Sequence, residues 1–363
     1  MSQLIKTNYK QMKKDNSLVG IKELAKLANV SIGTIDRVLH DRPGVAAKTK
    51  ERVLAVLQEH DYQPNMIARA LASRKARRIV VLIPSASPES AYWKAPLEGV
   101  RTAGSEILRY SFTLDVLLFD QNDRHSFIPL ATQLLEEDFD ALVLAPMFHQ
   151  EAQPLLQHCD ENKIPYVFIN SDIPGSDSTA YFGPDLFQSG CMSAQLINYI
   201  SNPADEILLV HISREMEMQH HLLRKEEGLL QYMQDNGMKQ KLHKLIIRDT
   251  AFSAIEQALT EQLKDTTIKV LFVTNSRVAS VARFIEEQQI AGICLIGFDY
   301  LPDNIAYLEK GIIDFLLCHK PIAQGYKSVM SLFQLLEAQQ EPQKINYMPI
   351  DVISKENYRY YEN

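Results

Sequence analysis

The sequence predicts two folds in one chain, a small all-α head followed by a large α/β body with parallel sheets. Residues 1–78 hold 16 Lys and Arg against 7 Asp and Glu, whereas residues 79–363 hold 22 against 38. The basic part contains short amphipathic helical patterns. From Arg78 onward, short apolar runs alternate with amphipathic helices, which is typical of a parallel sheet covered by helices. The charge split suggests a head that binds a polyanion, although a solvated basic face would show the same charge.

The composition places limits on the class of protein. A chain of 363 residues is long enough for two or more domains. With 46% hydrophobic and 23% charged residues, it is not a disordered, collagen-like or coiled-coil chain. No apolar run approaches the roughly 18 residues of a membrane-spanning helix, and residues 1–17 lack the apolar stretch of a signal peptide. We therefore expect a cytoplasmic protein without a membrane partner, whose four cysteines are reduced and hold no metal.

The head is predicted to contain three short helices. Residues 21–28 carry apolar side chains at the i, i+3, i+4, i+7 spacing of an amphipathic helix. Asn29 tolerates the left-handed conformation that a helix exit needs, and Ser31 is a favourable N-cap for a second helix over 32–40. Two short helices joined by a three-residue turn form a helix-turn-helix, and a third helix over 46–60 covers the pair.

Several short patterns in the head occur together. "VS" at 30–31 precedes the second helix, "RV" at 37–38 lies within it, and a Y-x-P-N-x-x-A-R-x-L pattern at 62–71 leads toward a strand. With these patterns, the segment from Val19 to Ser73 closely resembles the head of lactose-repressor (LacI/GalR) family transcription regulators. A helix-turn-helix alone is a weak signal, but its combination with the 62–71 pattern is highly specific.

The resemblance implies that the second helix enters the major groove of DNA with its N-terminal residues at base edges. Arg37 can donate two hydrogen bonds to a guanine, Ile32 can contact a thymine methyl group, and Gly33 admits close approach of the backbone. Asp36 stands where the family commonly has a small hydroxyl residue. Its carboxylate either accepts a hydrogen bond from cytosine, orients Arg37, or lowers non-specific affinity by repulsion.

Other head residues are expected to contact the DNA backbone or to kink the duplex. Ser31, Thr34 and Thr49 are candidate phosphate contacts, although local capping or solvation explains Thr34 and Thr49 equally well. The resemblance implies that residues 65–73 become a hinge helix only when two copies pair in the minor groove, with Leu71 as a wedge between base steps. Ordinary packing against the body is the alternative for Leu71. The hinge residues expected at the DNA are Asn65, Ala68, Leu71 and Ala72.

The body contains eight strand candidates: IVVLIP, TLDVLLFD, ALVLAP, YVFIN, EILLVHIS, KLIIRD, KVLFVT and CLIGFD. The body is similar over its length to the periplasmic-binding-protein-like effector domain of the same family, and IGFD at 296–299 is the most specific match. The resemblance implies two α/β lobes of type I joined by three crossings, with a ligand clamped between them.

We expect the chain to be divided into a flexible tail (1–17), a helix-turn-helix domain (18–64), a hinge and linker (65–76) and a body (77–363). Within the body we expect a first lobe at 77–172 and 320–342 and a second lobe at 173–319 and 343–363. The basic run SRKARR at 73–78 can track phosphates.

Candidate ligand contacts follow strand ends, because open parallel sheets bind ligands beyond the carboxyl ends of their strands. Tyr92 and Trp93 offer aromatic faces on which a sugar can stack, with core filling as the alternative for Trp93. By resemblance, Asp299 holds the family's usual polyol-binding position, and His319 matches a crossing position where relatives often carry a polar ligand contact. For the other candidates a surface-loop role is an equal alternative: Asp123, Phe148, His149, Asn170, Asp172, Gln188 and Asn275.

No motif points to catalysis. The sequence contains no GxGxxG, GxxxxGK[ST], GxSxG or HExxH, so we predict no enzyme, no cofactor and no metal site. His220 and His221 lie in a polar helix and are more simply solvated than metal-bound. The alternative is an α/β solute-binding protein or sugar-processing enzyme without a DNA role, but a solute receptor would not carry a basic helix-turn-helix. We predict a sugar-responsive transcription regulator, a repressor, that binds palindromic operator DNA as a homodimer.

Overall fold

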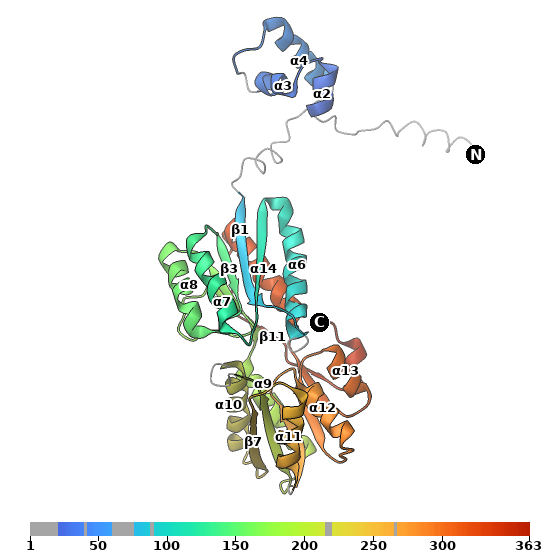
Figure 1. Ribbon diagram of the computed structural model, residues 1–363. Helices are drawn as coiled ribbons and strands as arrows, with labels where there is room; N and C mark the ends of the chain where they lie inside the picture. Colours follow the sequence, from blue (N-terminus) through green and yellow to red (C-terminus); the bar gives the residue numbers. More distant parts are fainter. Residues whose placement is uncertain (1–20, 40–41, 60–75, 88–90, 215–219, 265–266) are drawn as a thin grey trace, which may run out of the picture. The chain divides into compact units, whose positions relative to one another are not determined.

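The computed structural model divides the chain into two units, residues 1–74 and 75–363, which are described separately (Figure 1). No helix among the described residues is long and apolar enough to cross a bilayer. The described residues are 21–39, 42–59, 76–87, 91–214, 220–264 and 267–363.

The described part of the first unit holds the three predicted helices, α2 (Ile21–Leu27), α3 (Ile32–Leu39) and α4 (Ala47–Glu59). Asn29 has a φ of 48°, the left-handed conformation predicted for the exit of the first helix. The Ser31 Oγ accepts a hydrogen bond from the Thr34 N–H at 3.2 Å, which confirms the predicted N-cap. The small core of this unit is built from Leu24, Ala25, Ala28, Ile35, Val38, Val53 and Leu57.

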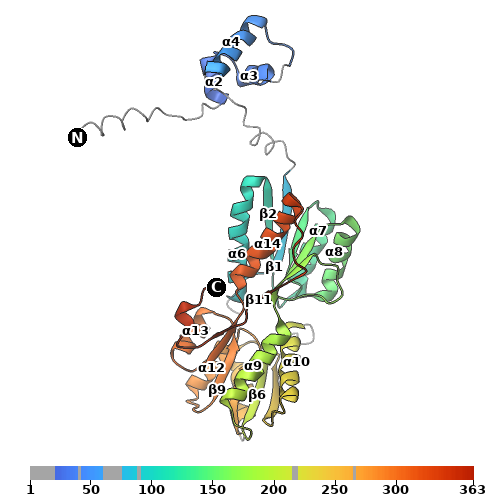
Figure 2. The ribbon, with the colours of Figure 1, turned by 180° about the vertical axis from the view of Figure 1, so that it is seen from behind.

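The first lobe of the body is built on a six-stranded, all-parallel sheet with strand order β11-β5-β4-β3-β1-β2. Strand β1, which lies between β3 and the edge strand β2, is apolar and buried from Ile79 to Ile83, as expected of a strand covered on both faces. Helices α6 (Lys94–Ile107) and α14 (Pro321–Ala338) lie side by side on one face, and α7 (Arg124–Glu136) and α8 (His149–Asn162) cover the other (Figures 1 and 2). The strands are β1 (Arg77–Pro84), β2 (Phe112–Phe119), β3 (Ala141–Leu144), β4 (Tyr166–Ile169), β5 (Ala180–Pro184) and β11 (Ile345–Met348).

The second lobe repeats this plan with strand order β12-β10-β9-β8-β6-β7, in which only β12 is antiparallel to its neighbour. Its strands are β6 (Glu206–Ile212), β7 (Lys241–Ile247), β8 (Ile268–Val273), β9 (Cys294–Phe298), β10 (Phe315–Cys318) and β12 (Asp351–Ile353). Its helices are α9 (Leu186–Ile200), α10 (His220–Asp235), α11 (Phe252–Leu263), α12 (Val278–Glu287) and α13 (Pro302–Glu309). The parallel α/β fold and all eight predicted strands are thereby confirmed.

The chain crosses between the lobes after β5, after β10 and after β11. The middle crossing lies at 319–320 as expected, but the other two lie one strand later than the expected boundaries at 172 and 342. The reason is that β5 pairs with β4 and β11 pairs with β5, so both strands complete the first sheet. The four cysteines form no disulfide, and Cys159 and Cys318 are buried.

Glycines bring α9 and α10 into close contact, and this contact positions one wall of the cleft described below. A Cβ atom at Gly190 would lie 2.0 Å from the backbone oxygen of Lys225, and one at Gly228 would lie 1.9 Å from that of Phe187. Only residues without a side chain allow the two backbones to approach this closely. The contact holds the α10 backbone at Lys225 against α9.

Candidate functional sites

The outer face of the helix-turn-helix carries the residues expected to read DNA. Ile32 is 44% exposed although Ile35, one turn further, is fully buried. Gly33 and Arg37 are also exposed. An exposed isoleucine in the first turn of a helix whose last turn carries an exposed arginine offers a surface that a partner can cover. The hydroxyl groups of Ser31 and Thr34 lie 2.9 Å apart, so the local capping foreseen for Thr34 occurs.

The remaining expected DNA contacts are Thr49, Asp36 and four hinge residues. Thr49 is half-buried near the start of α4. The side chain of Asp36 and the hinge residues Asn65, Ala68, Leu71 and Ala72 lie outside the described residues, so their expected roles stay predictions.

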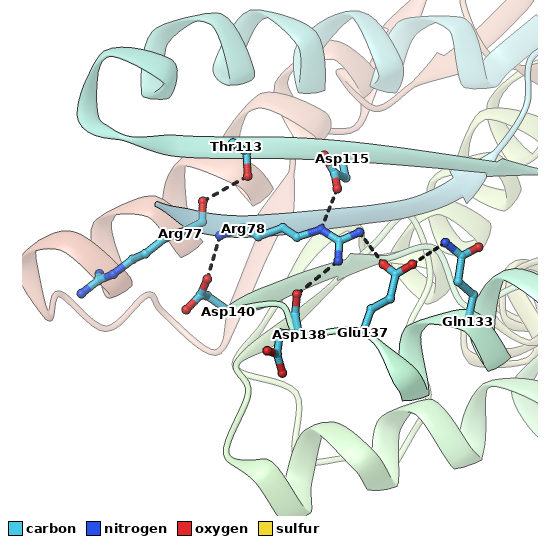
Figure 3. Close-up of polar contacts among 8 residues, drawn as sticks. All are labelled: Arg77, Arg78, Thr113, Asp115, Gln133, Glu137, Asp138 and Asp140. Atoms are coloured by element: carbon cyan, nitrogen blue, oxygen red, sulfur yellow. Dashed lines mark hydrogen bonds and ion pairs between the residues drawn. The ribbon is translucent and has the colours of Figure 1, made fainter. Parts of the chain in front are cut away.

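The basic run that ends at residue 78 is held by the body at its last two positions (Figure 3). The Arg78 Nε lies 2.6 Å from Asp115 Oδ2, and its Nη2 lies 2.6 Å from Glu137 Oε2. Its Nη1 donates to the backbone oxygen of Asp138 at 3.1 Å, and its backbone N–H donates to Asp140 Oδ2 at 2.7 Å. The charge of Arg78 is thus balanced by carboxylates of the first lobe.

Arg77 is also bound to the body. Its guanidinium donates to the backbone oxygen of Leu336 in α14, and its Cζ lies 5.8 Å from the centre of the Phe112 ring. Of the run SRKARR, these two residues anchor the start of β1 and are occupied by protein contacts.

Arg78→Ala is expected to lower the free energy of unfolding by about 1–2 kcal/mol, because it leaves carboxylates of the first lobe without their cation. The loss is modest because the Asp115 and Glu137 side chains are 44% and 32% exposed and can be hydrated. Urea denaturation of the full chain measures the change. Arg101→Ala, which removes an exposed arginine of α6, is the matched control, and an equal effect of both substitutions would contradict the anchoring role of Arg78.

A polar cleft lies between the two lobes at the carboxyl ends of their strands, where open parallel sheets bind ligands. The first-lobe wall consists of Tyr92, Trp93, Gln121, Asn122, Met147, Asn170 and Pro184. The second-lobe wall and the crossing contribute Leu186, Ser213, His221, Leu222, Lys225, Asn275, Ser276, Arg277, Asp299 and His319.

The first-lobe wall combines aromatic rings with fixed amides. The Tyr92 hydroxyl donates to Asn170 Oδ1 at 2.9 Å, and the Trp93 Nε1–H donates to Gln121 Oε1 at 3.0 Å. The two rings meet edge to face with centroids 5.2 Å apart. Burial raises the pKa of Tyr92 well above its ordinary value, so its hydroxyl stays neutral. This wall offers uncharged polar groups beside a rigid aromatic pair.

The second-lobe wall carries an opposed pair of charges. Lys225 is 6% exposed, its Nζ donates to the backbone oxygen of Thr274 at 3.0 Å, and it lies 3.6 Å from the centre of the Phe298 ring. Burial lowers the pKa of Lys225 to about 8, and the charge of Asp299 opposes this shift. Burial raises the pKa of Asp299 to about 6, and the charge of Lys225 opposes it. At neutral pH the wall therefore presents a carboxylate acceptor and an ammonium donor.

His319 at the crossing joins the two lobes. Its Nε2 lies 3.0 Å from the Ser189 Oγ of α9, and its ring stacks on Phe298 with centroids 5.7 Å apart. Its backbone oxygen accepts a hydrogen bond from Gln324 Nε2 of α14 at 2.8 Å. Burial, reinforced by the charge of Lys225, lowers the pKa of His319 to about 3, so the imidazole is neutral at physiological pH.

The structure brings six of the expected ligand contacts together in this cleft: Tyr92, Trp93, Asn170, Asn275, Asp299 and His319. The other five lie elsewhere. Asp123 caps α7, since its Oδ1 accepts the His125 N–H at 2.9 Å, and Gln188 donates its backbone N–H to Asp185. Phe148 is buried in the core of the first lobe, and His149 begins α8. Asp172 lines a separate hollow with Tyr181 and Tyr347.

Sequence reasoning missed several residues of the cleft, above all Lys225. Gln121 and Asn122 directly precede the expected Asp123, and Ser276 directly follows the expected Asn275. The positions of the strand ends therefore predicted the right segments, although not these residues. No strand end lies next to Lys225 in the sequence, because this residue lies inside a charged helix. His221, expected to be solvated, lines the cleft and is half-buried.

Comparison with known proteins agrees with the fold of each of the two units. Residues 20–65 match the model of bacterial regulatory proteins of the lacI family, and residues 79–340 match a periplasmic binding protein domain. The chain belongs to the LacI family.

Individual LacI-family relatives are distant. The HTH-type transcriptional regulator MalR of Staphylococcus xylosus is 26% identical over 174 residues, which cover 44% of this chain and about half (47%) of MalR. Catabolite control protein A of Priestia megaterium is 23% identical over 256 residues, 69% of this chain and 73% of that protein. A crystal structure described as a LacI transcriptional regulator from Bacteroides fragilis is 26% identical, with a TM-score of 0.73, and covers 79% of this chain and 100% of that one.

Proposed function

We propose that this LacI-family protein is a sequence-specific DNA-binding transcription regulator, a repressor, whose operator affinity is set by a sugar bound between its lobes. The observation that carries the proposal is that one chain joins an exposed helix-turn-helix face to a polar cleft between two α/β lobes. The protein would act in the cytoplasm on operator DNA, without a cofactor and without enzymatic activity.

The head supports a homodimer on a palindromic site. A single recognition helix spans only a half-site, so a two-fold dimer matches the symmetry of an operator. Ile32, Gly33 and Arg37 would contact bases, and the Ser31 hydroxyl would contact a phosphate.

The cleft supports a sugar as the effector. A sugar has a C–H face that stacks on an aromatic ring, here that of Tyr92, and hydroxyl groups that need both donors and acceptors. Trp93 is only 2% exposed and packs in the core of the first lobe, so it fills the core, as the alternative expected, and supports Tyr92 from behind the cleft. Asp299 would accept hydrogen bonds from hydroxyls, Lys225 would donate to them, and Asn170 and Asn275 can do either. The Asn275 Nδ2 already donates to the backbone oxygen of Ile212 at 2.8 Å, which fixes its orientation.

Arg37→Ala is expected to weaken operator binding about 5- to 150-fold and to relax the preference at one guanine in each half-site, since a bidentate arginine–guanine pair contributes ~1–3 kcal/mol of discrimination. Operator sequences recovered from a random DNA library by the parent and by the variant, followed by fluorescence anisotropy, measure both effects. Arg52→Ala, which removes an exposed arginine of α4, is the control and should leave base preference unchanged. If Arg37→Ala weakens all sequences equally, Arg37 contacts phosphate and not bases.

The sugar is tested by the thermal midpoint of the full chain in the presence of D-glucose, D-galactose, L-arabinose or D-glucuronate. A ligand at 100 times its Kd should stabilise the folded protein by about 2.7 kcal/mol. Trp93 is the single tryptophan of the chain and lines the cleft, so its fluorescence reports binding directly.

A further inference from the structure

The last residues of the chain pack against the back of the ligand cleft. We call Tyr358–Asn363 the tyrosine segment. The ring of Tyr361 stacks on Tyr300 with centroids 4.9 Å apart and planes inclined by 27°. The Tyr300 hydroxyl donates to the backbone oxygen of Tyr358 at 3.2 Å. Tyr300 directly follows Asp299, the carboxylate of the cleft, so the tyrosine segment holds the chain on one side of that residue.

The same segment holds the crossing at Lys320, which directly follows His319. The Lys320 backbone N–H donates to the Tyr361 hydroxyl at 3.2 Å. The Lys320 Nζ lies 4.2 Å from the centre of the Tyr361 ring, donates to the Glu362 backbone oxygen, and lies 3.4 Å from Asp351 Oδ2. One tyrosine therefore contacts the neighbours of two residues of the cleft.

The tyrosine segment also reaches the first lobe. Asn363 Oδ1 accepts the backbone N–H of Ile322 at 3.3 Å, in the first turn of α14. First-turn N–H groups have no partner inside their own helix, and Lys320 at the N-cap supplies no side-chain hydrogen bond. Tyr300 belongs to the second lobe and α14 to the first, so the segment bridges the two lobes.

Backbone conformation explains why such support is needed. Asp299 has a φ of 74° and Lys320 a φ of 50°, left-handed values that are unfavourable for residues other than glycine. Strained residues of this kind persist where their surroundings over-determine them, often at ligand sites. Asn304 supports Asp299 from the other side, since its Nδ2 donates to the Asp299 backbone oxygen at 2.9 Å.

We propose that the tyrosine segment is a positioning element of the effector cleft. Tyr361 holds the Asp299–Tyr300 and His319–Lys320 steps in their left-handed conformations, so that the carboxylate and the imidazole face the ligand. Asn363 ties this arrangement to α14, which couples ligand binding to the arrangement of the lobes. The proposal rests on the proposed function in one respect, that the cleft binds the effector.

Hydrogen exchange of the full chain, followed by mass spectrometry without ligand, tests the positioning directly. Tyr361→Ala should speed exchange in peptides that cover 297–301 and 318–323 about tenfold and leave peptides of β1 unchanged. Tyr360→Ala is the matched control, since the Tyr360 side chain is 84% exposed. Equal exchange in Tyr361→Ala and the parent would overturn the proposal, as would an equal increase throughout the body.

A conservative variant separates the stacking from the hydrogen bond. Tyr361→Phe keeps the ring on Tyr300 but loses the hydroxyl that accepts the Lys320 N–H. It should therefore restore slow exchange at 297–301 and leave 318–323 fast. Asn363→Ala is expected to speed exchange only at Ile322. If Tyr361→Ala does not fold, Tyr361→Phe and Asn363→Ala test the positioning role of the tyrosine segment.

Ligand affinity gives the functional readout. Whichever of the four sugars named above shifts the parent's thermal midpoint should bind Tyr361→Ala about tenfold more weakly and Tyr360→Ala equally well, as measured by Trp93 fluorescence. Unchanged affinity in Tyr361→Ala would overturn the positioning role. A parent that binds none of the four sugars would instead contradict the sugar effector, and the exchange experiment would still decide the role of the segment.

Discussion

Deletion of residues 1–75 is expected to lower affinity for the selected operator by at least about a thousandfold, to the level of non-specific binding or below. The physical reason is that the residues proposed to contact bases belong to the basic first unit, whereas residues 79–363 carry 22 Lys and Arg against 38 Asp and Glu. Such a body repels the phosphate backbone. Because it has its own hydrophobic cores and the whole cleft, the truncated chain should remain folded and bind the same ligand. Fluorescence anisotropy with operator DNA and calorimetry with ligand measure the two properties.

The control for this deletion is removal of residues 1–17 alone. These residues are polar and precede the first helical pattern of the head, so operator affinity should fall by less than about threefold, through the loss of four lysines. A truncated body that still bound the operator with the parent's affinity would place the DNA site outside the head.

The fold of the head followed from local signals. The left-handed Asn29 and the capping Ser31 act within a few residues of themselves, so their effect could be predicted without tertiary information. The eight predicted strands were found for a related reason, since a run of apolar residues between turn signals needs burial on both faces. The four strands that were missed are short or carry turn residues. Strand β5 reads AYFGP, and β12 is three residues long, so their pairing depends on neighbours distant in the sequence.

The residues of the candidate ligand cleft also fall into those that local sequence predicted and those that it did not. Asn170 was expected because it follows a buried strand, and Asp299 because it follows one and also matches the family's polyol-binding position; both residues are left-handed there. Lys225 was missed because only the close contact of α9 and α10 at Gly190 and Gly228 brings that turn of α10 to the cleft. Phe148 followed a strand end as well, yet it turns into the core beside Phe119 and Phe127. A strand end thus predicts which segments lie near the cleft, whereas the direction of each side chain depends on packing.

Sugar affinity is expected to depend on pH through Asp299. Burial holds the pKa of Asp299 at about 6, above its ordinary value of 3.8, so the free protein binds a proton there between roughly pH 4 and 6. For this group alone, stability of the ligand-free fold decreases as pH rises through that window, because the folded state binds more protons than the unfolded state. In the proposed complex, a sugar hydroxyl would donate to the ionised carboxylate. At pH 5 only about one tenth of the molecules are ionised at Asp299, so affinity should fall about tenfold from pH 7 to pH 5.

Lys225 should add a second limb to this profile. Burial lowers its pKa to about 8, so its ammonium loses a proton above that pH and would donate fewer hydrogen bonds to the proposed sugar. Affinity should therefore be highest between about pH 6 and 8 and decline on either side. Calorimetric titrations from pH 4.5 to 9.5 measure both limbs.

Asp299→Asn is expected to weaken sugar binding about 10- to 150-fold, since a hydrogen bond to a charged group contributes roughly 1.5–3 kcal/mol, and to remove the acidic limb of the profile. Asp299 lies far in sequence from the residues proposed to contact DNA, so the substitution should leave operator affinity close to the parent's. It should also abolish the response of the operator complex to the sugar. Asp303→Asn, at an exposed position in the first turn of α13, is the matched control and should change neither affinity nor pH profile. Leu71→Ala should behave in the opposite way, weakening specific operator binding while sugar affinity stays constant. If Asp299→Asn kept the acidic limb, a different group would titrate in the cleft, and the carboxylate of Asp299 would not be the acceptor of the sugar hydroxyl.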